Sequence, residues 1–253
     1  MAHIYLIRHG QASFGTENYD KLSEIGNRQA GVVGDYFSKQ NTPIAHVVHG
    51  EMSRQKQTAK ILATQASFSS KLVCHPSANE FDSDNLIKHY LPILAKESTE
   101  LSEILNKGEH WWAGGDNFEL FFRAMVELWQ MDKACPFESW SDFRLRCFKC
   151  LNDVAEMAEI DSKNSGAGKK GATILATSGG LISVIMQSIL NFENSTFMDM
   201  NMTINNASIS EVMWSTNQNM VTQEPLRKRN RLLSFNNITH LLQAKNSELI
   251  TRK

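Results

Sequence analysis

The 253-residue chain has few prolines and glycines, little excess charge and no long apolar run. Its 5 prolines and 14 glycines are too few for a collagen-like or low-complexity protein. Its 26 basic and 27 acidic residues give a formal net charge of −1. That balance argues against a protein that coats nucleic acid and against a chain kept disordered by its own charge. Composition therefore leaves a soluble globular protein.

Two local features, a basic run and several short apolar runs, do not indicate a nucleic-acid or membrane partner. The basic run 227–231 lacks interleaved aromatic residues and leads directly into a strand pattern, so a solvated turn is favoured over a nucleic-acid site. Apolar runs such as 181–186 are interrupted by Ser183 and are far shorter than the roughly 18–20 residues of a membrane-spanning helix. We expect neither a membrane nor a nucleic acid as partner.

The chain also lacks a secretory signal and a paired cysteine pattern. Its first residues enter an apolar strand directly, without a basic segment and a long apolar segment. Cys147 and Cys150 form a C-x-x-C within a helical pattern, and no second pair of metal ligands accompanies them. These features predict reduced, packed cysteines, no metal site and a cytoplasmic location.

Apolar strand patterns alternate with helical patterns through most of the chain. The alternation is typical of βαβ units. It predicts an α/β fold: a three-layer sandwich whose mostly parallel, six-stranded sheet has helices on both faces. The candidate strands are 4–7, 45–49, 71–75, 172–177, 207–214 and 231–235.

The middle of the chain differs from the rest. Helical patterns dominate 81–140, which we interpret as a helical insertion, or cap, within a single domain spanning 1–253. Trp111 and Trp112 lie in this insertion, and the sequence leaves open whether they line a pocket. The polar end, 244–253, is predicted to fray.

Three expected strand-to-helix turns carry the residues of chemical interest. Arg8-His9-Gly10 follows the first strand, His49 to Arg54 follows the second, and Ser178-Gly179-Gly180 follows a later one. Ligands of open parallel sheets bind beyond the carboxyl ends of the strands, so two arginines and several helix-start N–H groups should meet there and bind an anion. Neighbouring guanidinium charge would keep a histidine neutral and nucleophilic.

The residues LIRHGQ at 6–11 resemble the L-x-R-H-G-[EQ] signature of the histidine phosphatase superfamily, also called the phosphoglycerate mutase-like family. R-H-G alone is a weak signal, but further family patterns follow in the expected order. They are LSEIGNRQA at 22–30, SRQKQTA at 53–59, NEF at 79–81, NASI at 206–209 and NNITHL at 236–241.

The resemblance implies a role for each matched residue. His9 would be the nucleophile that becomes phosphohistidine, and Glu80 would protonate the leaving alkoxide and then activate water. Arg8 and Arg54 would hold the phosphoryl oxygens, and Gly179 would offer a backbone N–H. Neither a metal nor another cofactor is required. Two other acidic residues are alternatives to Glu80: Asp82 and Glu97.

The sequence departs from the family at one pocket position. Ser178 stands where the family has a second histidine, which predicts a weakened enzyme or one with a compensating group. Ser178 is also a candidate helix N-cap, and His49 is a candidate for the missing imidazole. Gln11 replaces the glutamate common in mutases, and Gly15 stands where mutases have asparagine, which argues against a phosphoglycerate mutase.

The residues thus predict a phosphomonoester phosphatase acting on a small phosphorylated substrate, with inorganic phosphate as product. The alternative is a non-catalytic member of the same fold that binds a phosphate ligand or a protein, and Ser178 is its motivation. The sequence carries no signal for the substrate or the oligomeric state.

Overall fold

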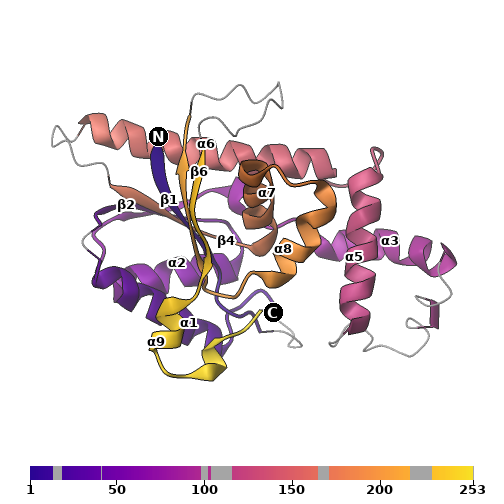
Figure 1. Cartoon of the computed structure of the whole chain (residues 1–253), viewed down its shortest axis with the longest axis horizontal. Helices are drawn as coiled ribbons and strands as arrows, with labels where there is room; N and C mark the ends of the chain where they lie inside the picture. The colour runs from indigo at the N-terminus through magenta and orange to yellow at the C-terminus, as the bar shows by residue number, and fades with distance from the viewer. Residues whose placement is uncertain are drawn as a thin grey trace. The chain divides into compact units, whose positions relative to one another are not determined.

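The computed structural model describes residues 1–13, 19–40, 42–97, 102–103, 116–164, 171–216 and 230–252 (Figure 1). The chain divides into two compact units, one of Met1–Glu80 with Arg146–Lys253 and one of Phe81–Leu145. Within the described ranges, no helix is long and apolar enough to cross a membrane. The described ranges do not include Gly15, Trp111, Trp112 or residues 227–229 of the basic run.

The first unit is built on a six-stranded sheet, which confirms the predicted α/β fold. Its strands lie in the order β3-β2-β4-β1-β5-β6. The pairs β3–β2, β2–β4 and β4–β1 are parallel, whereas β5 pairs antiparallel with β1 and with β6. The strands are β1 (Ala2–Arg8), β2 (Ile44–His49), β3 (Lys71–Cys74), β4 (Ala172–Thr177), β5 (Ile209–Trp214) and β6 (Arg231–Asn237).

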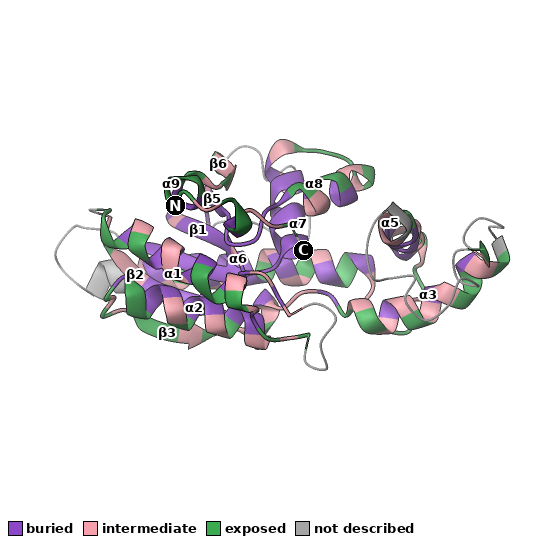
Figure 2. Ribbon diagram, turned by 90° about the horizontal axis from the view of Figure 1, so that it is seen from below, coloured by how far each residue is buried: buried purple, intermediate pink, exposed green. Residues whose placement is uncertain are grey.

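Helices cover both faces of this sheet (Figure 2). Apolar side chains of β1, β2 and β4 pack against α1 and α2, with Ile7, Val47 and Leu62 wholly buried between them. The opposite face carries α7, which contacts β1 and β6. The helices and short turns of this unit are α1 (Glu24–Ser38), α2 (Ser53–Gln65), η1 (Pro76–Ala78), α6 (Trp140–Asn164, which begins in the second unit), α7 (Gly179–Leu190), η2 (Asn194–Thr196), α8 (Phe197–Thr203), α9 (Thr239–Gln243) and η4 (Ser247–Leu249).

The second unit is helical and has its own aromatic core. It contains α3 (Ser83–Glu97), α5 (Asp116–Met131) and the start of α6. The Phe81 ring lies 5.0 Å from that of Trp129 and 5.4 Å from that of Phe143. Its bounds lie close to the helical segment expected at 81–140, and the assignment of that segment as a cap within one domain stays a prediction.

The described residues of 244–253, the segment that the sequence predicts to fray, make specific contacts with the rest of the first unit. Leu249 is only 3% exposed and packs into the core beside α1. Its carbonyl accepts a hydrogen bond of 2.9 Å from Gln29 Nε2, and Asn246 caps η4 by accepting from the Glu248 N–H. The polar composition of this segment concealed two apolar residues that pack against the core, Leu249 and Ile250, and the side chains that form these hydrogen bonds.

Candidate active site

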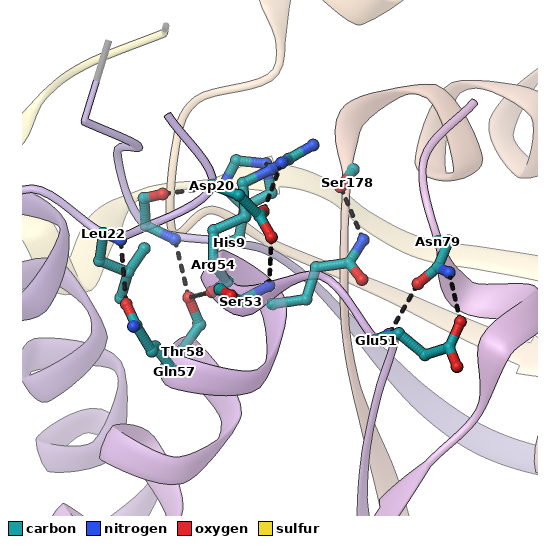
Figure 3. A network of polar contacts seen from close by, with 12 residues as sticks. His9, Asp20, Leu22, Glu51, Ser53, Arg54, Gln57, Thr58, Asn79 and Ser178 are labelled. Carbon is teal, nitrogen blue, oxygen red and sulfur yellow. Dashed lines mark hydrogen bonds and ion pairs between the residues drawn. The ribbon is translucent and has the colours of Figure 1, made fainter. Parts of the chain in front are cut away.

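The carboxyl ends of β1 and β4 form the floor of the candidate site. The two strands are parallel neighbours, and Arg8 lies opposite Thr177 in the register. The His9 N–H continues this pairing by donating to the Thr177 carbonyl at 2.9 Å. Because both strands end at the same level, the fold brings His9 and Ser178 to one edge of the sheet, where α2 also begins (Figure 3).

The imidazole of His9 is held at both nitrogens. Nδ1 lies 2.8 Å from the Gly10 carbonyl oxygen, and Nε2 lies 3.1 Å from Arg54 Nε. A carbonyl oxygen has no proton, so Nδ1 is the donor and the lone pair on Nε2 accepts from the guanidinium. Burial, followed by the charges of Arg54 and Arg8, lowers the pKa of His9 well below 6.5. His9 is therefore neutral at pH 7, with its nucleophilic nitrogen directed at Arg54.

Arg54 is oriented by an acidic residue that the sequence reasoning missed. Its Nη1 donates to Asp20 Oδ1 at 2.7 Å, and Asp20 Oδ2 accepts from the Ser53 N–H at 2.7 Å. The Tyr19 ring centre lies 5.4 Å from Arg54 Cζ. An acidic side chain is the expected partner for the N–H groups in the first turn of a helix. The sequence did not point to Asp20 because residue 20 and the start of α2 are far apart in the chain.

Arg8 directs Nη1 at two backbone carbonyls, whereas its Nε–H remains available. Its Nη1 donates to the Ile204 carbonyl and, at 3.0 Å, to the Arg252 carbonyl. Its Nε is buried and has no hydrogen-bond partner within the described part of the chain. Burial lowers the pKa of Arg8, and the nearby Glu80 carboxylate raises it. A buried guanidinium N–H without a partner suits an anionic ligand.

Glu80 lies at the end of a turn that other groups hold in place. Its Oε2 accepts from the Gly180 N–H at 2.9 Å, at the start of α7. Arg146 Nη1 donates to the carbonyls of Ser77 and Asn79 at 3.1 and 2.7 Å, which holds the backbone just before Glu80. The alternative Asp82 bonds instead to Asn85 at the start of α3 in the second unit, and the Glu97 side chain lies outside the described residues.

Ser178 occupies an N-cap position without acting as a cap. Ser23 shows the usual arrangement, because its Oγ accepts from the Gly26 N–H at 3.0 Å at the start of α1. Ser178 has extended backbone angles before α7 but makes no such bond. Its Oγ instead accepts from Gln55 Nε2 at 2.8 Å. Sequence reasoning missed Gln55, since only the fold places residue 55 beside residue 178.

Gly179 follows Ser178 at the first position of α7. A Cβ at this position would collide with Asn201 Oδ1 and lie 3.7 Å from Arg8 Nε. Its closeness to Arg8 Nε places the Gly179 backbone beside the Arg8 guanidinium.

His49 ends β2 as His9 follows β1. It is buried, and its Nδ1 donates to the Gly50 carbonyl at 2.6 Å. In the register His49 lies opposite Ala176, two residues before Ser178. The residue that contacts Ser178 is Gln55, so the compensating role of His49 stays a prediction.

The remaining motif residues hold the turn after β1. The Gly10 N–H donates to Thr58 Oγ1 at 3.0 Å, and the Gln11 N–H donates to Gln29 Oε1 at 2.7 Å. A Cβ on Gly10 would collide with the Gly26 carbonyl, so the chain approaches α1 too closely for any side chain here. These contacts position His9 through its backbone.

A metal centre is not evident in the ranges that the structure describes. They contain no group of three or more histidine, cysteine or acidic side chains placed to hold a metal ion. Cys147 and Cys150 are buried and form no disulfide among the described residues, and burial raises the pKa of Cys150 to about 12. The Cys150 thiol is therefore packed and protonated.

Comparison with known proteins finds a family model that matches part of the chain and solved structures that share its fold. The model of the histidine phosphatase superfamily (branch 1) matches residues 4–123. A probable phosphoglycerate mutase GpmB of Yersinia pestis is 35% identical over 69 residues, which make up 25% of this chain and 31% of that protein. The chain thus matches less than a third of the length of that curated relative.

Solved structures share the fold along nearly the whole chain. A phosphoglycerate mutase from Bacillus anthracis has a TM-score of 0.62 at 16% identity and covers 97% of both chains. A phosphoserine phosphatase from Entamoeba histolytica, solved with 3-phosphoglyceric acid, has a TM-score of 0.56 at 17% identity, with coverage of 95% of this chain and 100% of that one. A mycobacterial glucosyl-3-phosphoglycerate phosphatase has a TM-score of 0.56 at 16% identity, with coverage of 93% and 99%. At these identities the likeness establishes the fold alone.

Proposed function

We propose, from the premise that the chain belongs to the histidine phosphatase superfamily, that it hydrolyses phosphomonoesters through a phosphohistidine on His9. The observation that carries the proposal is the state of the His9 ring. Its Nδ1 proton is committed to the Gly10 carbonyl, its Nε2 lone pair faces Arg54, and its pKa is lowered well below 6.5. A neutral imidazole beside two guanidinium groups suits attack on an electrophilic phosphorus.

Substrate binding first rearranges Arg54. Its Nε–H occupies the nucleophilic lone pair, and Asp20 holds its Nη1. A bound phosphoryl group offers oxygen acceptors that draw the guanidinium off His9, which frees Nε2. Arg8 Nε, which is buried without a partner among the described residues, supplies a second contact. The two arginines then neutralise the charge on the transferring group.

Transfer to the enzyme forms one bond and breaks one. His9 Nε2 attacks phosphorus, and the bond from phosphorus to the ester oxygen breaks in line with it. Glu80 enters this step in its protonated form and gives that proton to the departing oxygen, so the alcohol leaves neutral. The phosphoryl group remains on Nε2, and Glu80 is left as a carboxylate.

Hydrolysis returns the enzyme to its starting state. The Glu80 carboxylate takes a proton from water as the water oxygen attacks phosphorus. The bond between phosphorus and Nε2 breaks, inorganic phosphate leaves, and His9 is again neutral. The Gly180 N–H and the turn held by Arg146 keep Glu80 in position for both steps.

One observation favours a second candidate, a non-catalytic member of the fold that binds phosphate. Ser178 brings no positive charge to the pocket position where the family has histidine. A phosphoglycerate mutase is disfavoured because Gln11 replaces the usual glutamate.

The test is hydrolysis of p-nitrophenyl phosphate by the wild type, His9→Ala and Ser178→His. The hydrolase proposal predicts turnover in the wild type, loss of turnover in His9→Ala, and an acid-labile phosphoenzyme after rapid quenching that His9→Ala does not form. An inactive wild type that gains turnover in Ser178→His supports the non-catalytic candidate. Full activity in His9→Ala overturns the assignment of the nucleophile.

A further inference from the structure

The side chain of Gln55 is buried next to Ser178 although nothing in the core requires an amide there. Gln55 is 0% exposed and Ser178 is 1% exposed. We infer that Gln55 is a positioning residue that holds the Ser178 hydroxyl as a hydrogen-bond donor toward the phosphoryl group. This inference rests on the proposed function and concerns the same pocket. It assigns the place of the absent imidazole to a neutral pair of side chains, which we call the Gln55–Ser178 pair.

The direction of the hydrogen bond between the two residues follows from a third. Gln55 Nε2 lies 3.1 Å from the Ala78 carbonyl oxygen and 2.8 Å from Ser178 Oγ. The carbonyl can only accept, so the amide nitrogen, and not its oxygen, occupies this end of the side chain. Both amide hydrogens are then used, and Ser178 Oγ is the acceptor of the second.

The Ser178 proton is consequently left for another acceptor. In the part of the chain that the structure describes, the bond from Gln55 is the one hydrogen bond that the Ser178 side chain makes. The hydroxyl does not cap α7, unlike that of Ser23 at α1. A hydroxyl whose lone pair accepts one bond directs its proton away from that donor. A phosphoryl oxygen bound at the strand ends is the acceptor this arrangement fits.

The other end of Gln55 shows that the amide is not explained by stability. Gln55 Oε1 is buried and lacks a hydrogen-bond partner among the described residues, and it lies against Gly50 so closely that a Cβ there would collide with it. A buried acceptor without a partner destabilises a fold. The Ala78 carbonyl does not depend on Gln55, because Thr177 Oγ1 also donates to it at 2.7 Å. An apolar side chain at position 55 would therefore keep the fold while removing the donor to Ser178.

The inference has a chemical consequence for the pocket. A hydroxyl held by an amide is a preorganised neutral donor, which stabilises growing charge on a phosphoryl oxygen without a reorganisation step. Neither member of the pair changes its protonation in the range in which histidine titrates. The pair therefore adds no limb to the pH profile near neutrality, whereas an imidazole at position 178 adds one.

A double-mutant cycle with Gln55→Leu, Ser178→Ala and the double variant tests the inference. Two quantities are measured: kcat/KM for p-nitrophenyl phosphate and the dissociation constant of inorganic phosphate by calorimetry. If Gln55 acts through the Ser178 hydroxyl, Gln55→Leu in the wild-type background lowers kcat/KM about tenfold and raises the dissociation constant of phosphate about tenfold. In the Ser178→Ala background the same substitution changes neither quantity. The melting temperature of Gln55→Leu is expected to equal or exceed that of the wild type. Gln65→Leu, an exposed position at the end of α2, is the matched control and leaves both quantities unchanged.

An equal loss from Gln55→Leu in both backgrounds overturns the inference, because it assigns Gln55 a role independent of Ser178. The absence of any loss overturns it as well. Should Gln55→Leu not fold, Gln55→Glu replaces it: a carboxylate can only accept, so it claims the Ser178 proton and is expected to weaken phosphate binding more strongly. The phosphate measurement does not require turnover. A wild type that binds phosphate without hydrolysing it therefore defeats the proposed function while the cycle still decides the inference.

Discussion

Two histidines in this protein have almost the same local setting and different surroundings. His9 follows β1 and His49 ends β2, both are buried, and each precedes a glycine. Each donates its Nδ1 proton to the carbonyl of that glycine, at 2.8 Å for His9 and 2.6 Å for His49. The strand, histidine and glycine in succession fix the tautomer in both places. Among the described residues, only His9 also receives a guanidinium N–H on Nε2, from Arg54.

The comparison separates what a local motif supplies from what the fold supplies. The motif leaves Nε2 unprotonated, which any nucleophilic histidine needs. Long-range contacts then decide the chemistry, since Arg54 comes from α2 and is held in turn by Asp20. His49, without an arginine on its ring, is the natural internal control for His9.

The largest expected effect comes from changing each histidine to asparagine. The Asn side chain preserves a donor near the glycine carbonyl and removes the nucleophile. We expect His9→Asn to lower kcat for p-nitrophenyl phosphate by about 10³-fold or more, and His49→Asn to stay within about threefold of the wild type. Steady-state kinetics on both variants measures this. A comparable loss in His49→Asn would give that residue the compensating role and end the contrast.

Arg54→Gln removes the guanidinium contact that distinguishes the His9 ring from the His49 ring. It takes away a phosphate contact and a charge that lowers the pKa of His9, so we expect kcat/KM to fall by about 10²–10³-fold. Because neutral His9 is the active form, the acidic limb of kcat/KM lies below pH 6.5 in the wild type and moves to higher pH in the variant. Profiles of both proteins with the same substrate remove the contribution of substrate ionisation. An unmoved limb would mean that Arg54 does not set the His9 pKa.

Gly10 and Gly50 should differ in how much stability the protein loses when each is changed to alanine. A Cβ on Gly10 meets the backbone of Gly26, which cannot move alone, and we expect Gly10→Ala to lower the free energy of unfolding by about 1–3 kcal/mol. A Cβ on Gly50 meets the side-chain oxygens of Gln55 and Asn79, which can rotate. Gly50→Ala should therefore cost less stability but disturb the Gln55 amide. Denaturant unfolding of both variants checks the order, and an equal cost would contradict it.

The smallest expected effect concerns His240, a buried histidine that belongs to neither of the two histidine–glycine pairs. His240 donates Nε2–H to the Ala207 carbonyl at 2.9 Å, and burial lowers its pKa to about 4. In the unfolded chain it takes up a proton near pH 6.5, whereas in the folded chain it stays neutral until about pH 4. Falling pH within that window therefore favours unfolding, by about 1 kcal/mol at pH 5.5.

The measurement is the free energy of unfolding of the wild type and His240→Gln between pH 7 and 5. The variant should show a shallower decline, with His9 supplying a slope of the same sign because its pKa is also lowered. Parallel curves for the two proteins would show that His240 does not contribute.

The sequence predicted the fold and the strand-end residues because both depend on local patterns. Arg8 ends β1, and His9 and Ser178 follow β1 and β4, whose apolar runs are evident; parallel strands end at a common edge. Their proposed roles rest on the resemblance and stay predictions. Gln55 and Asp20 were not predicted, because their importance depends on which residues distant in sequence they meet. The same holds for Leu249, which packs into the core from a largely polar segment.

The contacts of the C-terminal segment bear on when the pocket forms during synthesis. Arg8 donates to the Arg252 carbonyl, Gln29 donates to the Leu249 carbonyl, and the Asn206 N–H donates to the Thr251 carbonyl at 2.9 Å. Residues 249–252 leave the ribosome long after Arg8. A nascent chain that lacks this segment cannot complete the cradle around Arg8. The arginine that would hold the phosphoryl group is thus fully seated only after translation has reached this segment.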